Sequence, residues 1–122
     1  MTNISFADFE KVDIRIGTVV AAEVPEWSHW VMKLEVDFGD ELGRKKAFSG
    51  IMKFYKPEDL IGKQFPFVVN LEPKKIGPEK ELSEAMMIMA SPGDAISEEE
   101  AEDVAPILFE LQKKVPKGTK VR

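Results

Sequence analysis

The sequence predicts an all-β fold, a small barrel of five or six short strands. Apolar runs recur at short spacing along the 122 residues. Several of them alternate with period two, as in Met32, Leu34, Val36 and Phe38, and β-branched and aromatic residues dominate them. This many short strands in so short a chain favours a closed barrel over a helical bundle. The strands are expected within residues 12–24, 30–38, 46–51, 64–71, 84–90 and 106–111.

The turns and short helices have their own signals. Gly17 interrupts the first run, which predicts a bulge or bend where one strand serves both halves of the sheet. Ser5 is a candidate N-cap for a short helical turn. Pro57 and Gly62 bound a second short helix between the third and fourth strands. Ser97 begins a short acidic helix or loop that ends before Pro106.

Composition bounds the class of protein. The length is that of one domain, and no apolar run approaches the roughly 20 residues that a membrane span needs. The first residues lack the pattern of a secretory signal, so we expect a cytoplasmic protein. There is no cysteine, which excludes disulfides and thiolate metal sites. The net charge of −5 is uneven, since residues 83–105 carry seven acids and no base, while residues 106–122 carry five bases and one acid.

No catalytic or cofactor-binding pattern is present in the sequence. The single histidine, His29, follows Ser28 directly, and on an extended strand adjacent side chains point to opposite faces. The acids of residues 37–43 lack the alternation of a calcium loop and fit a turn between strands. No glycine-rich phosphate cradle occurs. We therefore expect a protein that is not an enzyme and that has no cofactor and no metal.

Lysines cluster near predicted strand ends. In a small five-stranded barrel, loops and one sheet face form a groove for oligonucleotides, where lysines neutralise phosphates and aromatic rings stack on unpaired bases. The alternative is a set of scattered, solvated lysines with aromatic residues in the core. Met86, Met87 and Met89 likewise fit either a core strand or an adaptable peptide-binding surface. The basic candidates are Arg44, Lys45, Lys46, Lys53, Lys56, Lys74, Lys75 and Lys80, and the aromatic ones are Trp27, Phe48, Phe54 and Tyr55.

Four stretches of the sequence resemble the tRNA-binding domain family. They are DFEKVDIRIGTVVAAEV (8–24), FSGIMKFYKPEDLIGKQFPFVVNLEPKKI (48–76), SEAMMIMAS (83–91) and VPKGTKV (115–121). Members of that family occur as C-terminal modules of methionyl-tRNA synthetases and as free-standing proteins. The segment KLEVDFGDELGRKKA (33–47) is similar to the CsaA-like branch, and FSGI to the synthetase-type branch. Residues 24–29 depart from the family pattern, and Leu82 replaces a basic residue.

The resemblance implies a fold, a function and a set of contacts. It implies one OB-fold domain over residues 1–122, a five-stranded Greek-key barrel with short helices and terminal extensions, in which residues 93–122 contribute to a homodimer contact. Its implied function is non-catalytic tRNA binding, in trans to an aminoacyl-tRNA synthetase. The alternative is a CsaA-like homodimeric export chaperone that binds unfolded peptides. Glu84 is expected to have a structural role. With Lys53 added from the lysine pattern, the expected RNA contacts are Ser49, Lys53, Asn70, Lys74, Lys75 and Ser83.

Overall fold

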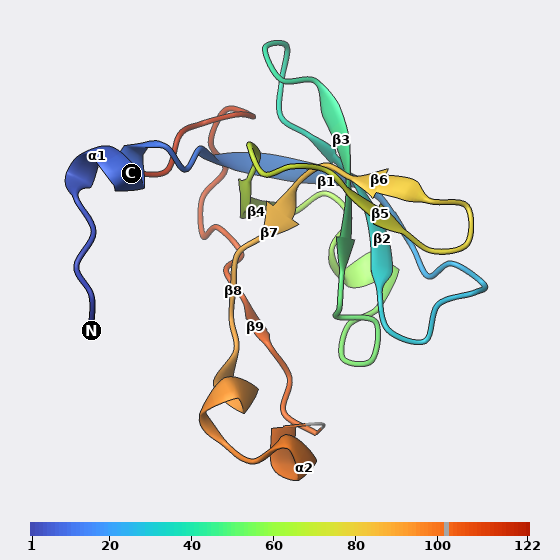
Figure 1. Ribbon diagram of the computed structural model, residues 1–122. Coiled ribbons are helices and arrows are strands. Elements are labelled where there is room, and N and C mark those ends of the chain that lie inside the picture. Colours follow the sequence, from blue (N-terminus) through green and yellow to red (C-terminus); the bar gives the residue numbers. More distant parts are fainter. Residues whose placement is uncertain (102) are drawn as a thin grey trace.

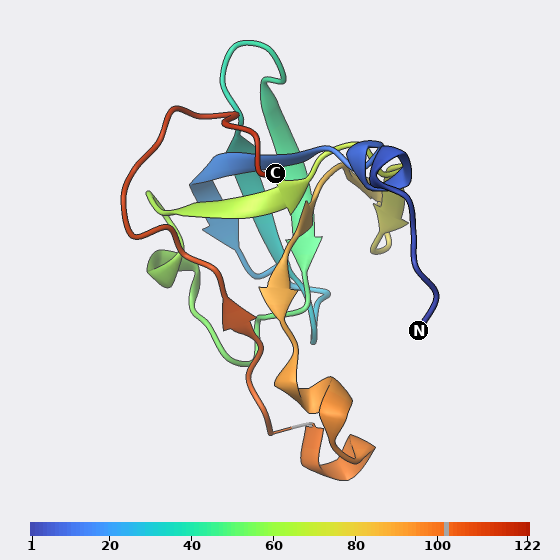
Figure 2. The same ribbon diagram turned by 90° about the vertical axis from the view of Figure 1, so that its left-hand side faces the viewer.

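The computed structural model describes residues 1–101 and 103–122 (Figure 1). Five antiparallel strands form one sheet in the order β3-β2-β1-β4-β7. The sheet curls into a nearly closed barrel, so the predicted all-β, OB-like fold is confirmed (Figure 2). The strands are β1 (Ile14–Glu23), β2 (Met32–Asp37), β3 (Arg44–Ser49), β4 (Gln64–Val68) and β7 (Met86–Met87).

The core follows the period-two pattern of the strands. In β2, Met32, Leu34 and Val36 are fully buried, and the residues between them are partly exposed. The ring of Phe38 packs edge-on against that of Phe67 inside the barrel, with centroids 5.5 Å apart. Apolar alternation therefore directs one face of β2 inward, as the sequence predicts, whereas every residue of β4 is buried.

The long strand β1 joins the two halves of the barrel, but its irregularity does not fall at Gly17. Residues 14–18 pair with β4 and residues 18–23 pair with β2, and the register shifts between Val19 and Ala21. Gly17 has a different role, because a Cβ atom there would overlap the side chains of Val36 and Phe38. The glycine allows close packing across the barrel. The strand does change pairing partner next to it, at Thr18, but the predicted bulge lies farther along, between Val19 and Ala21.

Side-chain hydrogen bonds close the barrel between β3 and the segment before β7. The Lys46 amide donates to Glu84 Oε1 at 3.1 Å, and the Glu84 amide donates to the Lys46 carbonyl at 2.8 Å. The Phe48 amide donates to Ser83 Oγ at 3.1 Å. The Ser-Glu pair thus completes the hydrogen bonding of a strand edge that has no regular partner there.

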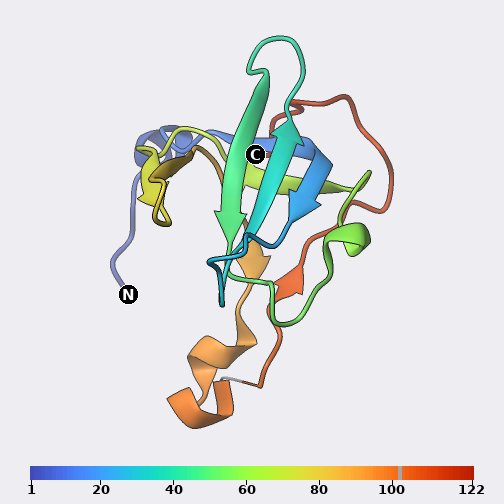
Figure 3. The same ribbon diagram turned by 90° about the vertical axis from the view of Figure 1, so that its right-hand side faces the viewer.

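A short hairpin lies beside this closure and was not expected from the sequence, in which residues 73–82 read as a polar connection. It consists of β5 (Lys74–Ile76) and β6 (Glu81–Ser83), paired in register from Lys74 with Ser83 to Ile76 with Glu81. Figure 3 shows it projecting from the barrel on the side where β2 and β3 lie. Strands of three mostly polar residues carry no period-two apolar signal, which explains why the pattern missed them.

Short helices occupy the predicted places. The helix α1 (Phe6–Glu10) is capped by Ser5, whose Oγ accepts from the Asp8 amide at 3.0 Å. The 3-10 turn η1 (Pro57–Asp59) begins at Pro57. No helix within residues 1–101 and 103–122 is long and apolar enough to cross a membrane.

An arm extends from the barrel between β7 and the C-terminal segment (Figure 1). It contains β8 (Met89–Ala90), the 3-10 turn η2 (Pro92–Ala95), the acidic helix α2 (Glu98–Ala101) and β9 (Ile107–Leu108). The Glu100 amide donates to Ser97 Oγ at 3.4 Å, in agreement with the predicted cap. Glu102, also in the expected acidic segment, lies outside the described residues.

Candidate nucleic-acid interface

A groove of about 590 Å³ lies between the β1–β2 loop and the β5–β6 hairpin. We call it the hairpin groove. Aromatic and aliphatic side chains form most of its wall, and Lys74, Glu72 and Glu84 supply charge. Its apolar lining comprises Trp27, Trp30, Val31, Phe48, Leu71, Ile76, Ala85 and Met86.

Two glycines hold the tryptophan rings in the hairpin groove. A Cβ atom at Gly77 would lie 2.5 Å from the Trp27 ring, and one at Gly50 would lie 2.9 Å from Trp30 Nε1. Each ring therefore packs directly on backbone. Trp27 also meets Phe48 with ring centroids 6.4 Å apart, while Trp30 keeps 71% of its surface exposed. An exposed, supported aromatic ring can stack on a planar ligand.

Ser28 fixes the loop that carries both tryptophans. Its Oγ accepts from the Val31 amide at 2.8 Å and donates to the Val31 carbonyl at 2.8 Å. Ser28 is 7% exposed, and its hydroxyl is occupied by these loop contacts. The adjacent His29 lies exposed in the groove wall. The serine therefore shapes the loop and is not presented as a nucleophile.

The hairpin lysines point in different directions. Lys74 pairs with Ser83 and lines the groove, whereas Lys75 pairs with Leu82 on the opposite face of the two strands. Lys80 lies in the turn, with a left-handed φ of 56°. Within the described residues, none of these three lysines makes an ion pair. They are the cations of the hairpin that remain available to an anionic ligand.

An ion pair ties the hairpin to the barrel. Lys33 Nζ of β2 lies 2.9 Å from Glu81 Oε1 of β6. The hydrogen bond to Glu81 raises the pKa of Lys33, and the same bond lowers the pKa of Glu81. Lys33 thus balances the negative charge of Glu81. This carboxylate therefore reduces the positive potential of the neighbouring hairpin lysines less than an unpaired carboxylate would.

Three predicted RNA contacts are buried or already hydrogen-bonded within the protein. Ser49 is 7% exposed at the end of β3, and Ser83 Oγ accepts from the Phe48 amide. Asn70 Oδ1 accepts from the Asp13 amide at 2.9 Å, and its Nδ2 donates to the Lys11 carbonyl at 2.6 Å. Asn70 therefore joins the end of β4 to the segment that follows α1.

The six predicted contacts do not converge on one point. Lys74 and Ser83 line the hairpin groove, and Lys75 lies on the outer face of the same hairpin. Lys53 is farther along, beside the arm, where its Nζ lies 3.8 Å from Asp103 Oδ1 and 5.6 Å from the centre of the Phe54 ring. Asn70 lies in a third place, under α1.

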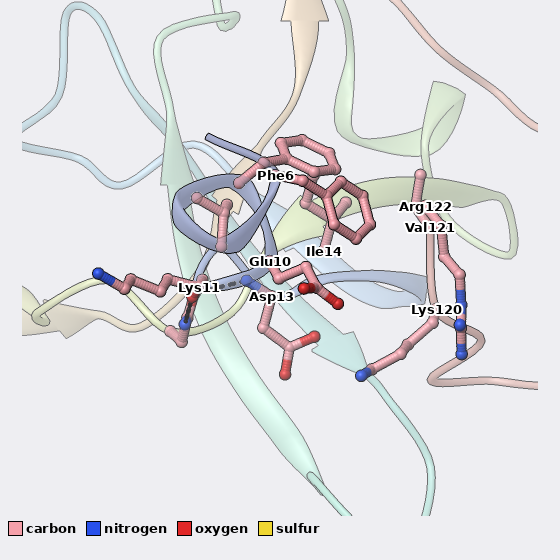
Figure 4. Close-up of a pocket in the computed structure, with 11 residues that line it drawn as sticks. Phe6, Glu10, Lys11, Asp13, Ile14, Lys120, Val121 and Arg122 are labelled. Carbon is pink, nitrogen blue, oxygen red and sulfur yellow. Dashed lines mark hydrogen bonds between the residues drawn. The ribbon is translucent and has the colours of Figure 1, made fainter. Parts of the chain in front are cut away.

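That third place is a groove of about 330 Å³ between α1 and the C-terminal residues (Figure 4). Phe6, Phe9 and Val12 lie on one side, and Val121 and Arg122 on the other. Phe6 is 73% exposed, so this terminal groove presents apolar surface to solvent. The segment 107–111, which falls within the predicted dimer contact of residues 93–122, lies elsewhere, with the Leu111 amide bonded to the Gln64 carbonyl.

Sequence reasoning missed Trp30 and the role of the hairpin. The motifs that carry the family resemblance do not include Trp30, so the resemblance gave it no part. The sequence feature that could have indicated it is Gly50, just after β3. The Trp30 ring packs onto this glycine, which has no side chain. Sequence spacing alone does not bring these two residues together.

A family described as "Putative tRNA binding domain" matches residues 14–120. The chain belongs to this family. The match spans the barrel, the hairpin, the arm and most of the C-terminal segment, so the family resemblance of the separate motifs is confirmed by one continuous match.

Solved structures with the same fold match this chain over nearly its whole length. The MetRS-related protein from Pyrococcus horikoshii is 34% identical with a TM-score of 0.83, and all of both chains is covered. The chaperone CsaA from Bacillus anthracis is 36% identical with a TM-score of 0.79, over 99% of this chain and 100% of that one. The chain is thus about equally similar, in sequence identity and in fold, to a CsaA protein and to a MetRS-related protein.

Curated relatives include methionine–tRNA ligases. That of Methanocaldococcus jannaschii is 38% identical over 122 residues, which is 100% of this chain and 17% of the ligase. That of Dichelobacter nodosus is 40% identical over 90 residues, or 74% of this chain and 13% of the ligase. The chain therefore spans less than a fifth of the length of these relatives.

Proposed function

We propose that this protein binds tRNA without catalysing a reaction, using the β5–β6 hairpin and the hairpin groove. Membership of the family supports tRNA as the ligand. The observation that carries the location is the set of three hairpin lysines without ion pairs in the described part of the chain, next to supported aromatic rings. Lysines contact phosphates, and Trp27, Trp30 and Phe48 stack on unpaired bases.

The local charge favours this site over the rest of the surface. The protein is acidic overall, and half of its other basic side chains make ion pairs within the described residues, such as Arg15 with Asp13 at 2.7 Å and Lys117 with Asp37 at 3.0 Å. The hairpin instead gathers three lysines without ion pairs within residues 74–80. A cation already paired gains less from a phosphate than a free one, because it must first give up its partner. Binding is therefore concentrated on the hairpin.

The protein acts in the cytoplasm, in trans to an aminoacyl-tRNA synthetase, and contributes RNA affinity that the synthetase exploits. The support is the kinship with methionine–tRNA ligases, whose matched portion is less than a fifth of each ligase. The site described here has stacking rings and cations, and its only serine–histidine neighbours have the serine hydroxyl engaged with Val31. This composition fits binding and supports a role without chemistry.

The protein functions as a homodimer whose contact includes the terminal groove. Phe6, Phe9 and Val121 expose apolar surface there, and a two-fold contact would bury such a patch against its own copy. Sedimentation of the Phe6→Glu variant tests this. The dimer should dissociate, and an unchanged dimer would show that the contact lies elsewhere.

The experiment that tests the tRNA site is a titration of bulk tRNA at low and moderate salt. We expect measurable binding that weakens with salt, because counterions are released from the phosphates. Lys74→Ala with Lys75→Ala should weaken it and reduce the slope of log affinity against log salt by about one to two. The control is Lys56→Ala with Lys113→Ala, which changes the net charge equally at exposed positions outside the groove. Absent binding, or equal effects of both pairs, would refute the site.

A second candidate function is that of a peptide-binding chaperone of the CsaA type. The observation in its favour is the mostly apolar lining of the hairpin groove, with Leu71 51% and Met86 50% exposed. Apolar contacts tolerate salt, whereas phosphate contacts do not. Binding of an unfolded peptide that persists at moderate salt, without binding of tRNA, would favour this function over the first.

A further inference from the structure

A third groove, of about 760 Å³, lies between the barrel and the arm. We call it the arm groove. It meets the hairpin groove at Trp30 and Gly50, which line both. Its walls are apolar on both sides, because Trp30 and Phe54 come from the barrel side and Met89, Pro92, Val104 and Pro106 come from the arm.

Several contacts fix the arm to the barrel. Tyr55 Oη donates to the Pro106 carbonyl at 2.6 Å, and within the arm Met89 of β8 pairs with Leu108 of β9. Leu108 and Met89 also pack against the barrel core. The two walls of the arm groove are therefore held at a set spacing by bonds at the base of the arm.

The charge of the arm groove is opposite to that of the hairpin. Asp94 and Glu98 line it, and neither makes an ion pair in the described part of the chain. The one cation in its lining is Lys53, which lies 3.8 Å from Asp103. Phosphates are repelled by such a surface, so the tRNA of the proposed function does not explain this groove.

We propose that the arm groove docks a segment of a partner protein that is apolar and positively charged. Its apolar side chains would lie on Trp30, Phe54 and Met89, in a cleft whose size suits a few such side chains. Its lysine or arginine side chains would meet Asp94 and Glu98, which gives orientation and selects against acidic segments. This site shares the Trp30 ring with the hairpin groove, but its acidic residues lie on the arm, and the proposal does not depend on tRNA binding at the hairpin.

A labelled peptide of alternating leucine and lysine tests this proposal, with fluorescence anisotropy as the measurement. The full chain should bind it, and should bind a leucine–glutamate peptide at least tenfold more weakly. Asp94→Asn with Glu98→Gln should weaken binding about three- to tenfold, since two exposed charge contacts are lost. The matched control is Glu99→Gln with Glu100→Gln, which makes the same charge change on the same arm outside the groove lining.

Each remaining outcome overturns the proposal. If both pairs of substitutions weaken binding equally, the peptide responds to the overall charge of the arm and not to the groove. If Trp30→Ala leaves binding unchanged while circular dichroism shows a folded protein, the apolar wall has no part. If the peptide does not bind and the oligomer dissociates with Trp30→Ala, a second copy of the chain covers the groove.

Discussion

The hydrogen bonds of Glu84, which close the barrel, give a prediction that distinguishes a role in stability from a role in RNA binding. Glu84→Ala removes the acceptor of the Lys46 amide, which is 3.1 Å from Oε1. The amide points away from β2, toward Glu84, so no neighbouring strand replaces the lost bond. An amide left without a partner at a partly buried site costs about 1–3 kcal/mol. For a domain of this size, about 2 kcal/mol lowers the melting temperature by on the order of 10 °C.

Thermal unfolding followed by circular dichroism measures this loss, and Glu84→Gln is the control. The glutamine carbonyl can still accept from the Lys46 amide, so this variant should melt within a few degrees of the wild type. The small remaining difference arises because a neutral acceptor makes a weaker hydrogen bond than a carboxylate. Both variants remove one negative charge, so they should affect tRNA binding alike below their melting temperatures. Equal destabilisation by the two variants, or none by Glu84→Ala, would refute the closure described here.

Three further predictions follow from the turns and ion pairs. Gly77→Ala should destabilise the protein by about 1–2 kcal/mol in urea unfolding, because φ is 76° and the new methyl group meets Trp27. Lys80→Gly should instead raise stability by up to about 1 kcal/mol by relieving a left-handed lysine, while tRNA affinity falls. The Gly39 amide and Lys117 hold the pKa of Asp37 below its usual value, so its contribution is present above pH ~4 and is lost as pH falls below it. Asp37→Asn should reduce this loss of stability at acid pH. A variant whose stability depends on pH as that of the wild type does would contradict the prediction.

The alternation of apolar residues made the barrel predictable from the sequence. Met32, Leu34 and Val36 show the period of two, and five of the six predicted runs overlap the strands of the barrel sheet. The sixth run, 106–111, instead supplies β9, which pairs with β8 in the arm. The starts of the short helices were also predictable, because Ser5 and Pro57 influence only the residues next to them in sequence. These features depend on neighbours in sequence, where pattern arguments are strongest.

The site was less predictable because it depends on contacts between distant residues. The side of the hairpin on which Lys74 and Lys75 lie follows from pairing with Ser83 and Leu82, which the sequence pattern did not reveal. The packing of Trp30 on Gly50 joins two segments only after the barrel closes. Lys53, grouped with the other lysines by spacing, instead lies beside Asp103.

Chemical-shift mapping with tRNA tests the central claim most directly. Titrating unlabelled tRNA into the nitrogen-15-labelled protein at low salt should move the amides of residues 74–83 and the indole signals of Trp27 and Trp30 first. Amides of α1 and of the arm should move least. Shifts that cluster on the arm or the terminal groove, with the hairpin unaffected, would contradict the assignment of tRNA binding to the hairpin.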